Sequence, residues 1–194
     1  MSLILGYFLQ CIFIILPLFL AGIFFIFLLK KGFFVYLAKP IDLGLTIGKK
    51  RLFGNNKTFR GIIIIPIATF VFWMLIAIIL KIMRINPDLF VFDYNFSGYI
   101  KILIFALAYP IGELPNSFIK RRLGIEPGCL AIKQNVRFFF NFYDLVDSLI
   151  LCFFVLLFVY KINIAYALGA FFIGTLIHCF TDVLMRKIKL KEKA

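Results

Sequence analysis

The sequence predicts an all-α membrane protein, a bundle of five transmembrane helices with two long cytoplasmic loops, forming one integral membrane domain over 1–194. The composition and a series of long apolar spans support this fold class. Hydrophobic residues make up 63% of the chain and charged residues only 16%, whereas soluble proteins have about 45–50% apolar and about 25% charged residues. A soluble domain of this length cannot bury that much apolar surface. Lipid is therefore the expected solvent.

The first apolar span, 3–29, contains no charged side chain. At 1.5 Å per residue it is long enough to cross a hydrocarbon core of roughly 30 Å. A cleaved signal peptide has basic residues before a shorter apolar stretch, but here Lys30 and Lys31 follow the span. We therefore expect an uncleaved transmembrane helix. Further apolar spans are predicted at 62–80, 99–118, 145–160 and 162–184.

Basic residues concentrate in the predicted loops 30–61 and 119–144 and in the C-terminal tail, and the formal net charge is +13. The positive-inside rule makes these segments cytoplasmic, and five spans then put the N-terminus outside the cell (plasma) membrane. Topology alone explains this charge pattern, but the cations also suit anionic ligands such as nucleotide or lipid phosphates. Nucleic acid is not expected as a partner, because the chain has no soluble recognition module.

The first loop contains several glycines and a basic stretch before the second span. The side chains of Lys57, Thr58 and Arg60 are candidate hydrogen-bond donors to a phosphate. The glycines allow backbone N–H groups to approach a ligand closely. The spacing of a Walker A motif is absent. The alternative interpretation is a flexible basic loop that rests on anionic headgroups.

A second polar segment covers 112–128. If it is helical from Pro115, then Ser117, Lys120 and Arg121 share one face, with Glu113 one turn earlier. Such a face suits a phosphate, with Glu113 orienting a cation, and it equally fits a solvated helix end. Glycine and proline between 124 and 128 are expected to end the helix.

Asp144 and Asp147 precede an apolar run, and their i, i+3 spacing puts both carboxylates on one helix face, where they can share a divalent cation. Acids also stabilise helix N-termini, so capping is the alternative. Asp147 lies about one turn inside the membrane segment, where an ionised group is costly and usually functional. His178 is interpreted as a hydrogen-bonded packing residue, and Asp182 as a partner of Arg186.

Several motifs together resemble the CDP-archaeol synthases and their bacterial relatives, distant cousins of the phosphatidate cytidylyltransferases. They are PIDLG (40–44), FGNNKTFRG (53–61), ELPNSFIKRRLGIEPG (113–128) and DLVDS (144–148). The resemblance implies that a cytidylyl group moves from CTP to a lipid phosphate, phosphatidate or an isoprenoid glycerol phosphate, with Mg²⁺ as cofactor and pyrophosphate as the second product. Such an enzyme is a nucleotidyltransferase of phospholipid biosynthesis.

The resemblance also implies roles for individual residues. Asp144 and Asp147 would bind the metal and act with Lys120 in catalysis. The implied substrate-binding residues are Lys57, Thr58, Arg60, Glu113, Asn116, Ser117 and Arg121. The chain departs from the family pattern where Leu145 replaces Gln, Phe59 replaces Trp and Asp182 replaces Asn, which leaves the role of His178 open.

Other classes of function compete with this hypothesis. A CDP-alcohol phosphotransferase would carry its DG and AR residues before further aspartates in one run, and this sequence has no such run. A non-catalytic membrane scaffold or a small ion or solute transporter is the main alternative, because intramembrane acids can line an ion path. The sequence does not identify the lipid, the number of metal ions, or whether the protein forms a homodimer in the membrane lipids that surround it.

Overall fold

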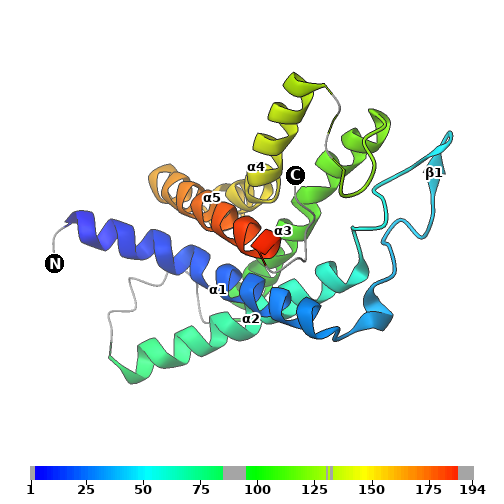
Figure 1. Cartoon of the computed structure of the whole chain (residues 1–194). Coiled ribbons are helices and arrows are strands. Elements are labelled where there is room, and N and C mark those ends of the chain that lie inside the picture. The colour runs from blue at the N-terminus through cyan, green and yellow to red at the C-terminus, as the bar shows by residue number, and fades with distance from the viewer. Residues whose placement is uncertain (1–2, 85–94, 130, 132, 188–194) are drawn as a thin grey trace.

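Long helices dominate the computed structural model, which describes residues 3–84, 95–129, 131 and 133–187 (Figure 1). The helices are α1 (Leu3–Lys31), α2 (Phe59–Ile82), α3 (Phe96–Arg122), α4 (Gln134–Phe158) and α5 (Ile164–Lys187). Each of these five helices is long and apolar enough to cross a membrane. The prediction of an all-α membrane bundle is confirmed.

Most helix ends lie beyond the predicted apolar spans, whereas α4 ends at Phe158 rather than at 160 and α5 begins at Ile164 rather than at 162. Helix α4 begins at Gln134 rather than at 145, and α3 continues to Arg122 rather than ending at 118. The predicted loop 119–144 is therefore wrong in extent, since only 123–133 lies between the two helices. Hydropathy marks the part of a helix that suits hydrocarbon, whereas the backbone hydrogen bonds of a helix continue equally well into a polar region.

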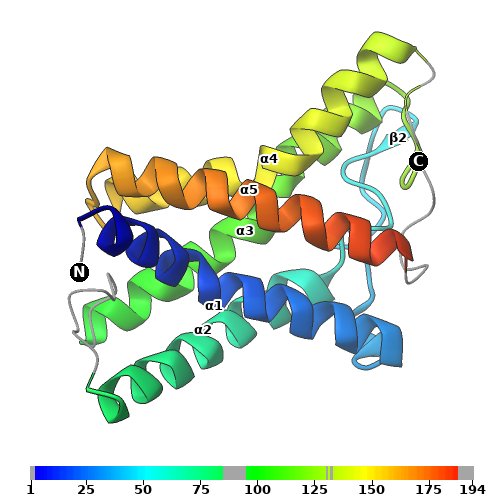
Figure 2. The same cartoon turned by 60° about the vertical axis from the view of Figure 1, so that its left-hand side comes forward.

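The first and last helices run side by side in the same direction (Figure 2). The Tyr7 hydroxyl donates to the Ala165 carbonyl oxygen at 2.7 Å, and the packing around Gly169 leaves no room for a Cβ atom. The core of the bundle is apolar and tightly packed. Its largest fully buried hydrophobic side chains include Ile14, Trp73, Ile102, Phe105 and Leu156.

A small hairpin occupies the segment between α1 and α2. It follows a 3-10 turn (Val35–Leu37) and pairs β1 (Thr46–Ile47) with β2 (Lys50–Arg51) in antiparallel register. The connecting turn contains Gly48 with φ +64°, a conformation that glycine adopts without strain. The hairpin, the end of α3 and the beginning of α4 lie together at one end of the bundle, here named the basic end (Figure 2).

Asp42 fixes the fold of the hairpin from inside. Its side chain is buried and accepts hydrogen bonds from the backbone N–H groups of Gly44 (3.1 Å), Phe53 (3.1 Å) and Gly54 (3.0 Å). It also forms an ion pair with Arg51. Burial alone raises the pKa of this carboxyl, but these donors outweigh it and lower the pKa to about 2. The only acid in the first loop therefore stabilises its structure.

Two arginines at the end of α3 hold the hairpin against the bundle. Arg122 donates to the carbonyl oxygens of Ile47 (2.9 Å), Lys50 (3.0 Å) and Arg51. Arg121 Nε donates to the carbonyl oxygen of Phe53 at 3.1 Å. Because a guanidinium presents several donors in a fixed plane, it can satisfy several backbone acceptors at once. The first loop is thereby attached to the helix that carries the second motif.

Candidate active site

Helices α3 and α4 approach most closely where the polar residues of the second and third motifs meet. A Cβ atom on Gly112 would lie 2.9 Å from both the backbone oxygen of Asp147 and the Cα of Ser148. Only glycine fits such a contact without moving a helix. The contact brings Asn116, one turn after Gly112, against the acidic face of α4.

Asn116 bridges the two aspartates that the spacing argument selected. Its Nδ2 donates to an oxygen of Asp144 at 2.7 Å and to an oxygen of Asp147 at 2.6 Å. The two carboxylates therefore face one point, as the i, i+3 spacing predicts. Asn116 and Asp147 are buried, and Asp144 is half-buried at the rim. The remaining oxygen of Asp147 accepts from the backbone N–H of Ser148 at 2.7 Å.

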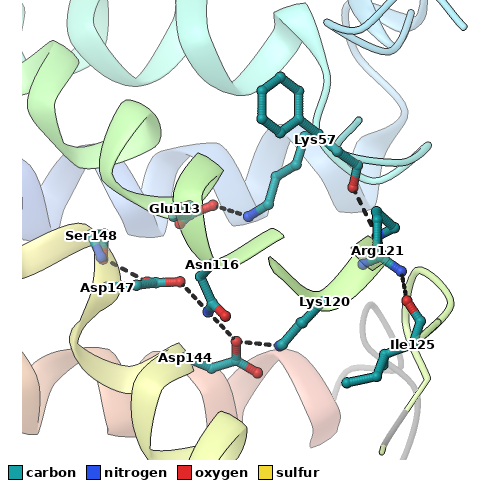
Figure 3. Close-up of polar contacts among 10 residues, drawn as sticks. Lys57, Glu113, Asn116, Lys120, Arg121, Ile125, Asp144, Asp147 and Ser148 are labelled. Atoms are coloured by element: carbon teal, nitrogen blue, oxygen red, sulfur yellow. Dashed lines mark hydrogen bonds and ion pairs between the residues drawn. The ribbon is translucent and has the colours of Figure 1, made fainter. Parts of the chain in front are cut away.

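Two lysines form ion pairs with carboxylates of this acidic region (Figure 3). Lys120 forms an ion pair with Asp144, and Lys57, from the loop before α2, forms one with Glu113. Burial alone lowers the pKa of Lys57, but Glu113 outweighs it and, together with Asp144 and Asp147, raises the pKa. We name the group formed by Lys57, Glu113, Asn116, Lys120, Asp144 and Asp147 the polar cluster.

The other predicted site residues lie outside this cluster. The Arg121 guanidinium turns away from the acids of the cluster, toward the carbonyl oxygens of Phe53 and Ile125 (Figure 3). Ser117 is buried in the helix packing. Residues 117, 120 and 121 lie on one face of α3, as the helical spacing predicts. Of the three, only Lys120 reaches an acid of the cluster, because tertiary partners decide where a long side chain points.

The beginning of α2 carries the remaining predicted residues of the first motif. Thr58 occupies the N-cap position, and its side chain makes no capping hydrogen bond. Arg60 donates to the backbone oxygen of Phe33 at 3.3 Å. Both residues come shortly after Lys57 in the sequence. Of these three residues, only Lys57 has a described contact with an acid of the polar cluster. The spacing argument missed Asn116, which only the resemblance singled out.

His178 connects α5 to the acidic face of α4. Its Nδ1 lies 3.0 Å from the backbone oxygen of Leu145. A carbonyl oxygen only accepts hydrogen bonds, so Nδ1 carries a proton. The imidazole also contacts the ring of Tyr109, with centroids 6.0 Å apart. These contacts agree with the interpretation of His178 as a hydrogen-bonded packing residue. The predicted pairing of Asp182 involves the Arg186 side chain, which lies outside the described structure.

The described residues contain no group of three or more His, Cys, Asp or Glu side chains that could hold a metal ion. Such a group is not needed for magnesium, which commonly binds through one or two carboxylates, waters and substrate phosphates. The carboxylates of Asp144 and Asp147, converging on one amide, offer that smaller set.

Similarity to known proteins identifies the family. Residues 2–194 match the model of the CarS-like family, described as CDP-archaeol synthase. The chain belongs to the CDP-archaeol synthase family. As a member of this family it is a membrane cytidylyltransferase that makes a CDP-activated lipid, and the resemblance predicted from the sequence motifs is confirmed.

Individual relatives agree with this assignment. The CDP-archaeol synthase of Pyrobaculum aerophilum is 28% identical over 155 residues, which are 79% of this chain and 80% of the relative. That of Pyrobaculum islandicum is 27% identical over 156 residues, with the same shares of the two chains. The CDP-archaeol synthase of Saccharolobus solfataricus is 32% identical over 118 residues, 60% of this chain and 58% of the relative.

A solved structure shares the fold of this family member. It is described as an intramembrane enzyme for archaeal membrane lipids biosynthesis, and it aligns with a TM-score of 0.53 at 22% identity. The alignment covers 89% of this chain and 92% of the other. None of these similarities supports the alternative of a scaffold or a transporter, or phosphatidate as the lipid.

Proposed function

We propose that the protein transfers CMP from CTP to the phosphate of an isoprenoid glycerol ether lipid and releases pyrophosphate. The observation that carries this proposal is the convergence of Asp144 and Asp147 on Asn116, with Lys57 and Lys120 beside them. The reaction requires two anionic reactants to meet, which needs positive charge and orientation rather than a covalent enzyme intermediate. The relatives named CDP-archaeol synthase support an archaeol-type lipid.

Magnesium is the proposed cofactor, and an unsatisfied atom supports its fit. The Oδ1 atom of Asn116 is buried and accepts no hydrogen bond from the described residues. A half-turn of the side-chain amide exchanges Nδ2 and Oδ1, so that an oxygen would face the space between Asp144 and Asp147. These residues would hold the ion. Bound there, magnesium would supply charge neutralisation and orientation for the triphosphate of CTP.

The two lysines would then exchange partners. Each is held beside the reaction region by a carboxylate, Lys57 by Glu113 and Lys120 by Asp144. When phosphates bind, the ammonium groups would donate to phosphate oxygens and offset their charge. An oxygen of the lipid phosphate attacks the α-phosphorus of CTP and forms a new P–O–P bond. The bond from the α-phosphorus to the bridging oxygen breaks, and pyrophosphate leaves with the electron pair.

The other residues predicted to bind substrate lie outside the polar cluster. Thr58 and Arg60 lie next to and three residues after Lys57 in the sequence, and they stay predicted substrate ligands. Ser117 and Arg121 act in our proposal through the packing of α3 and the attachment of the hairpin. The basic end would face the cytoplasm, as the charge of its loops predicts, because CTP is a cytoplasmic nucleotide.

Cytidylyl transfer by purified protein tests this function. The protein in detergent is incubated with Mg²⁺, CTP labelled at the α-phosphate, and a panel of isoprenoid ether and acyl ester lipid phosphates. We expect label in the ether lipid fraction with wild type and its loss with Asp144→Asn. Asn141→Ala, an exposed position one turn earlier on α4, is the matched control that should retain transfer. No transfer to any lipid of the panel would refute the proposal.

A further inference from the structure

A cavity of about 220 Å³ adjoins the polar cluster on the side away from α4. Residues of α1, α2, α3, α5 and the loop before α2 line it, and α4 does not contribute. Gly22 and Phe25 on α1 and Met185 on α5 are only half-buried. The cavity is therefore not sealed from the surrounding lipid where α1 and α5 face one another.

The lining changes in character from one part to another. Lys57, Thr58 and Glu113 form a polar part, and Phe25, Ile26, Ile62 and Ile65 belong to an apolar part. A small soluble anion would need only the polar part. A molecule with an anionic head joined to an apolar chain matches both parts, because each group then meets a surface of its own kind.

The depth of the cavity along α1 falls within the half of a bilayer that is nearer the basic end. Its lining on α1 spans 22–26, and the helix ends at Lys31. At 1.5 Å per residue, this lining lies about 8 to 14 Å from the helix end. Half of a hydrocarbon core measures about 15 Å. A lipid of the leaflet at the basic end can therefore enter the cavity without leaving its own layer.

Lys57 connects the cavity to the polar cluster. Its side chain lines the cavity, forms an ion pair with Glu113, and is close enough to Asp144 and Asp147 for their charges to act on it. His178 supplies a second connection, since it lines the cavity while its Nδ1 donates to the backbone between the two aspartates. A phosphate held by Lys57 would thus lie beside the proposed nucleotide site.

We propose that this cavity is the binding site for the acceptor lipid phosphate, an inference that rests on the proposed function. Lys57 and Thr58 bind the phosphate, the glycerol and the first chain carbons fill the apolar part, and the chains leave between α1 and α5 into the bilayer. The volume of about 220 Å³ is below the roughly 300–1,000 Å³ of pockets that enclose a drug-sized ligand. It therefore suits a headgroup but not two complete isoprenoid chains.

Gly22 offers a way to fill the cavity without disturbing the helix packing. A Cβ atom built on Gly22 meets no heavy atom within 4 Å. Gly22→Phe therefore places a ring in open space, where the first chain carbons would lie. Ile23→Phe is the matched control, because Ile23 is the next residue on α1, is 38% exposed and does not line the cavity.

Photolabelling tests the site independently of catalysis. The probe is an isoprenoid ether lipid phosphate with a diazirine on the first carbons of one chain, irradiated with wild-type protein in detergent without CTP. We expect adducts on the cavity residues of α1 and α5, competed by unlabelled lipid phosphate but not by the same lipid without its phosphate. Gly22→Phe should lower this labelling at least about tenfold, and Ile23→Phe should leave it unchanged.

The outcomes separate this inference from the proposed function. Adducts mainly on α4, or labelling that the uncharged lipid competes equally well, would overturn the cavity assignment even if wild type transfers CMP. Specific labelling of the cavity by a protein that transfers no CMP would support the lipid site and refute the enzymatic proposal. If Gly22→Phe does not fold, Met185→Trp fills the cavity from α5, and the adduct map of wild type needs no variant.

Discussion

Two of the buried aspartates of the described structure, Asp42 and Asp147, differ in their surroundings. Asp42 accepts hydrogen bonds from three backbone N–H groups and pairs with Arg51. Asp147 accepts from one backbone N–H and from Asn116, whose own Oδ1 is unsatisfied within the described structure. A fully satisfied buried charge stabilises a fold, whereas an incompletely satisfied one beside other acids is available to a ligand. The comparison supports a structural role for Asp42 and is consistent with the proposed role of Asp147 in the reaction.

The largest expected effect is on catalysis and comes from Asp147→Asn. The variant keeps the size of the side chain and an oxygen for the Ser148 N–H, but removes a charge from the proposed metal site. Cytidylyl transfer should fall about a thousandfold, with little change in the thermal unfolding temperature in detergent. Transfer near the wild-type rate would place Asp147 with Asp42 among the structural acids.

Gly112→Ala should lower transfer about a hundredfold, because α3 and α4 must move apart and displace Asn116 from the aspartates. The added Cβ would lie 2.9 Å from the backbone of α4. The control is Gly174→Ala, whose Cβ would meet the side chain of Leu149 at 3.1 Å, a contact that a small rotation relieves. Initial rates with labelled CTP compare the two variants, and equal rates would contradict the role given to the close contact.

Asp42→Asn should show the opposite pattern from Asp147→Asn. Loss of the carboxylate removes the ion-pair partner of Arg51 and weakens the bonds to the hairpin backbone, which should lower the free energy of unfolding by about 2 to 3 kcal/mol. Thermal unfolding in detergent measures this loss. Transfer per folded molecule should stay within about threefold of wild type, since Asp42 belongs to no part of the polar cluster. A stable variant without activity would reverse the assignment.

The pH dependence of the free energy of unfolding should also reveal the contribution of the Asp42 carboxylate. Its pKa is lowered from 3.8 to about 2 by folding, so its contribution is complete above pH 3.8 and is lost as the pH falls toward 2. One pKa unit corresponds to about 1.4 kcal/mol, so the lowering from 3.8 to about 2 contributes about 2.5 kcal/mol. Unfolding by denaturant between pH 5 and about 2 should show this loss in wild type and a flatter profile in Asp42→Asn.

The sequence predicted the parts of the molecule that depend on local pattern. Apolar length located each membrane helix, and the i, i+3 spacing placed Asp144 and Asp147 on one face. The ends of α3 and α4 were missed, because hydropathy falls where a helix leaves the apolar region although the helix continues. The match of residues 2–194 to one family confirmed the resemblance that the motifs indicated.

Other features could not be predicted because they depend on contacts between distant segments. Lys57 meets Glu113 only after α2 and α3 have packed, and Arg121 finds one of its acceptors, the Phe53 carbonyl oxygen, in the loop that holds the hairpin. Long flexible side chains accept whichever partner the tertiary structure offers. The close contact at Gly112 likewise requires knowledge of which helices are neighbours.

The packing of α1 against α5 has a consequence for biogenesis. The ribosome delivers α1 first and α5 last, yet the Tyr7 bond to Ala165 and the tight fit at Gly169 need both. The wall of the cavity formed by Gly22 and Met185 is completed only by that final insertion. A nascent chain stalled before 164 would already contain both aspartates and both lysines, but would leave their lipid-facing side open until synthesis ends.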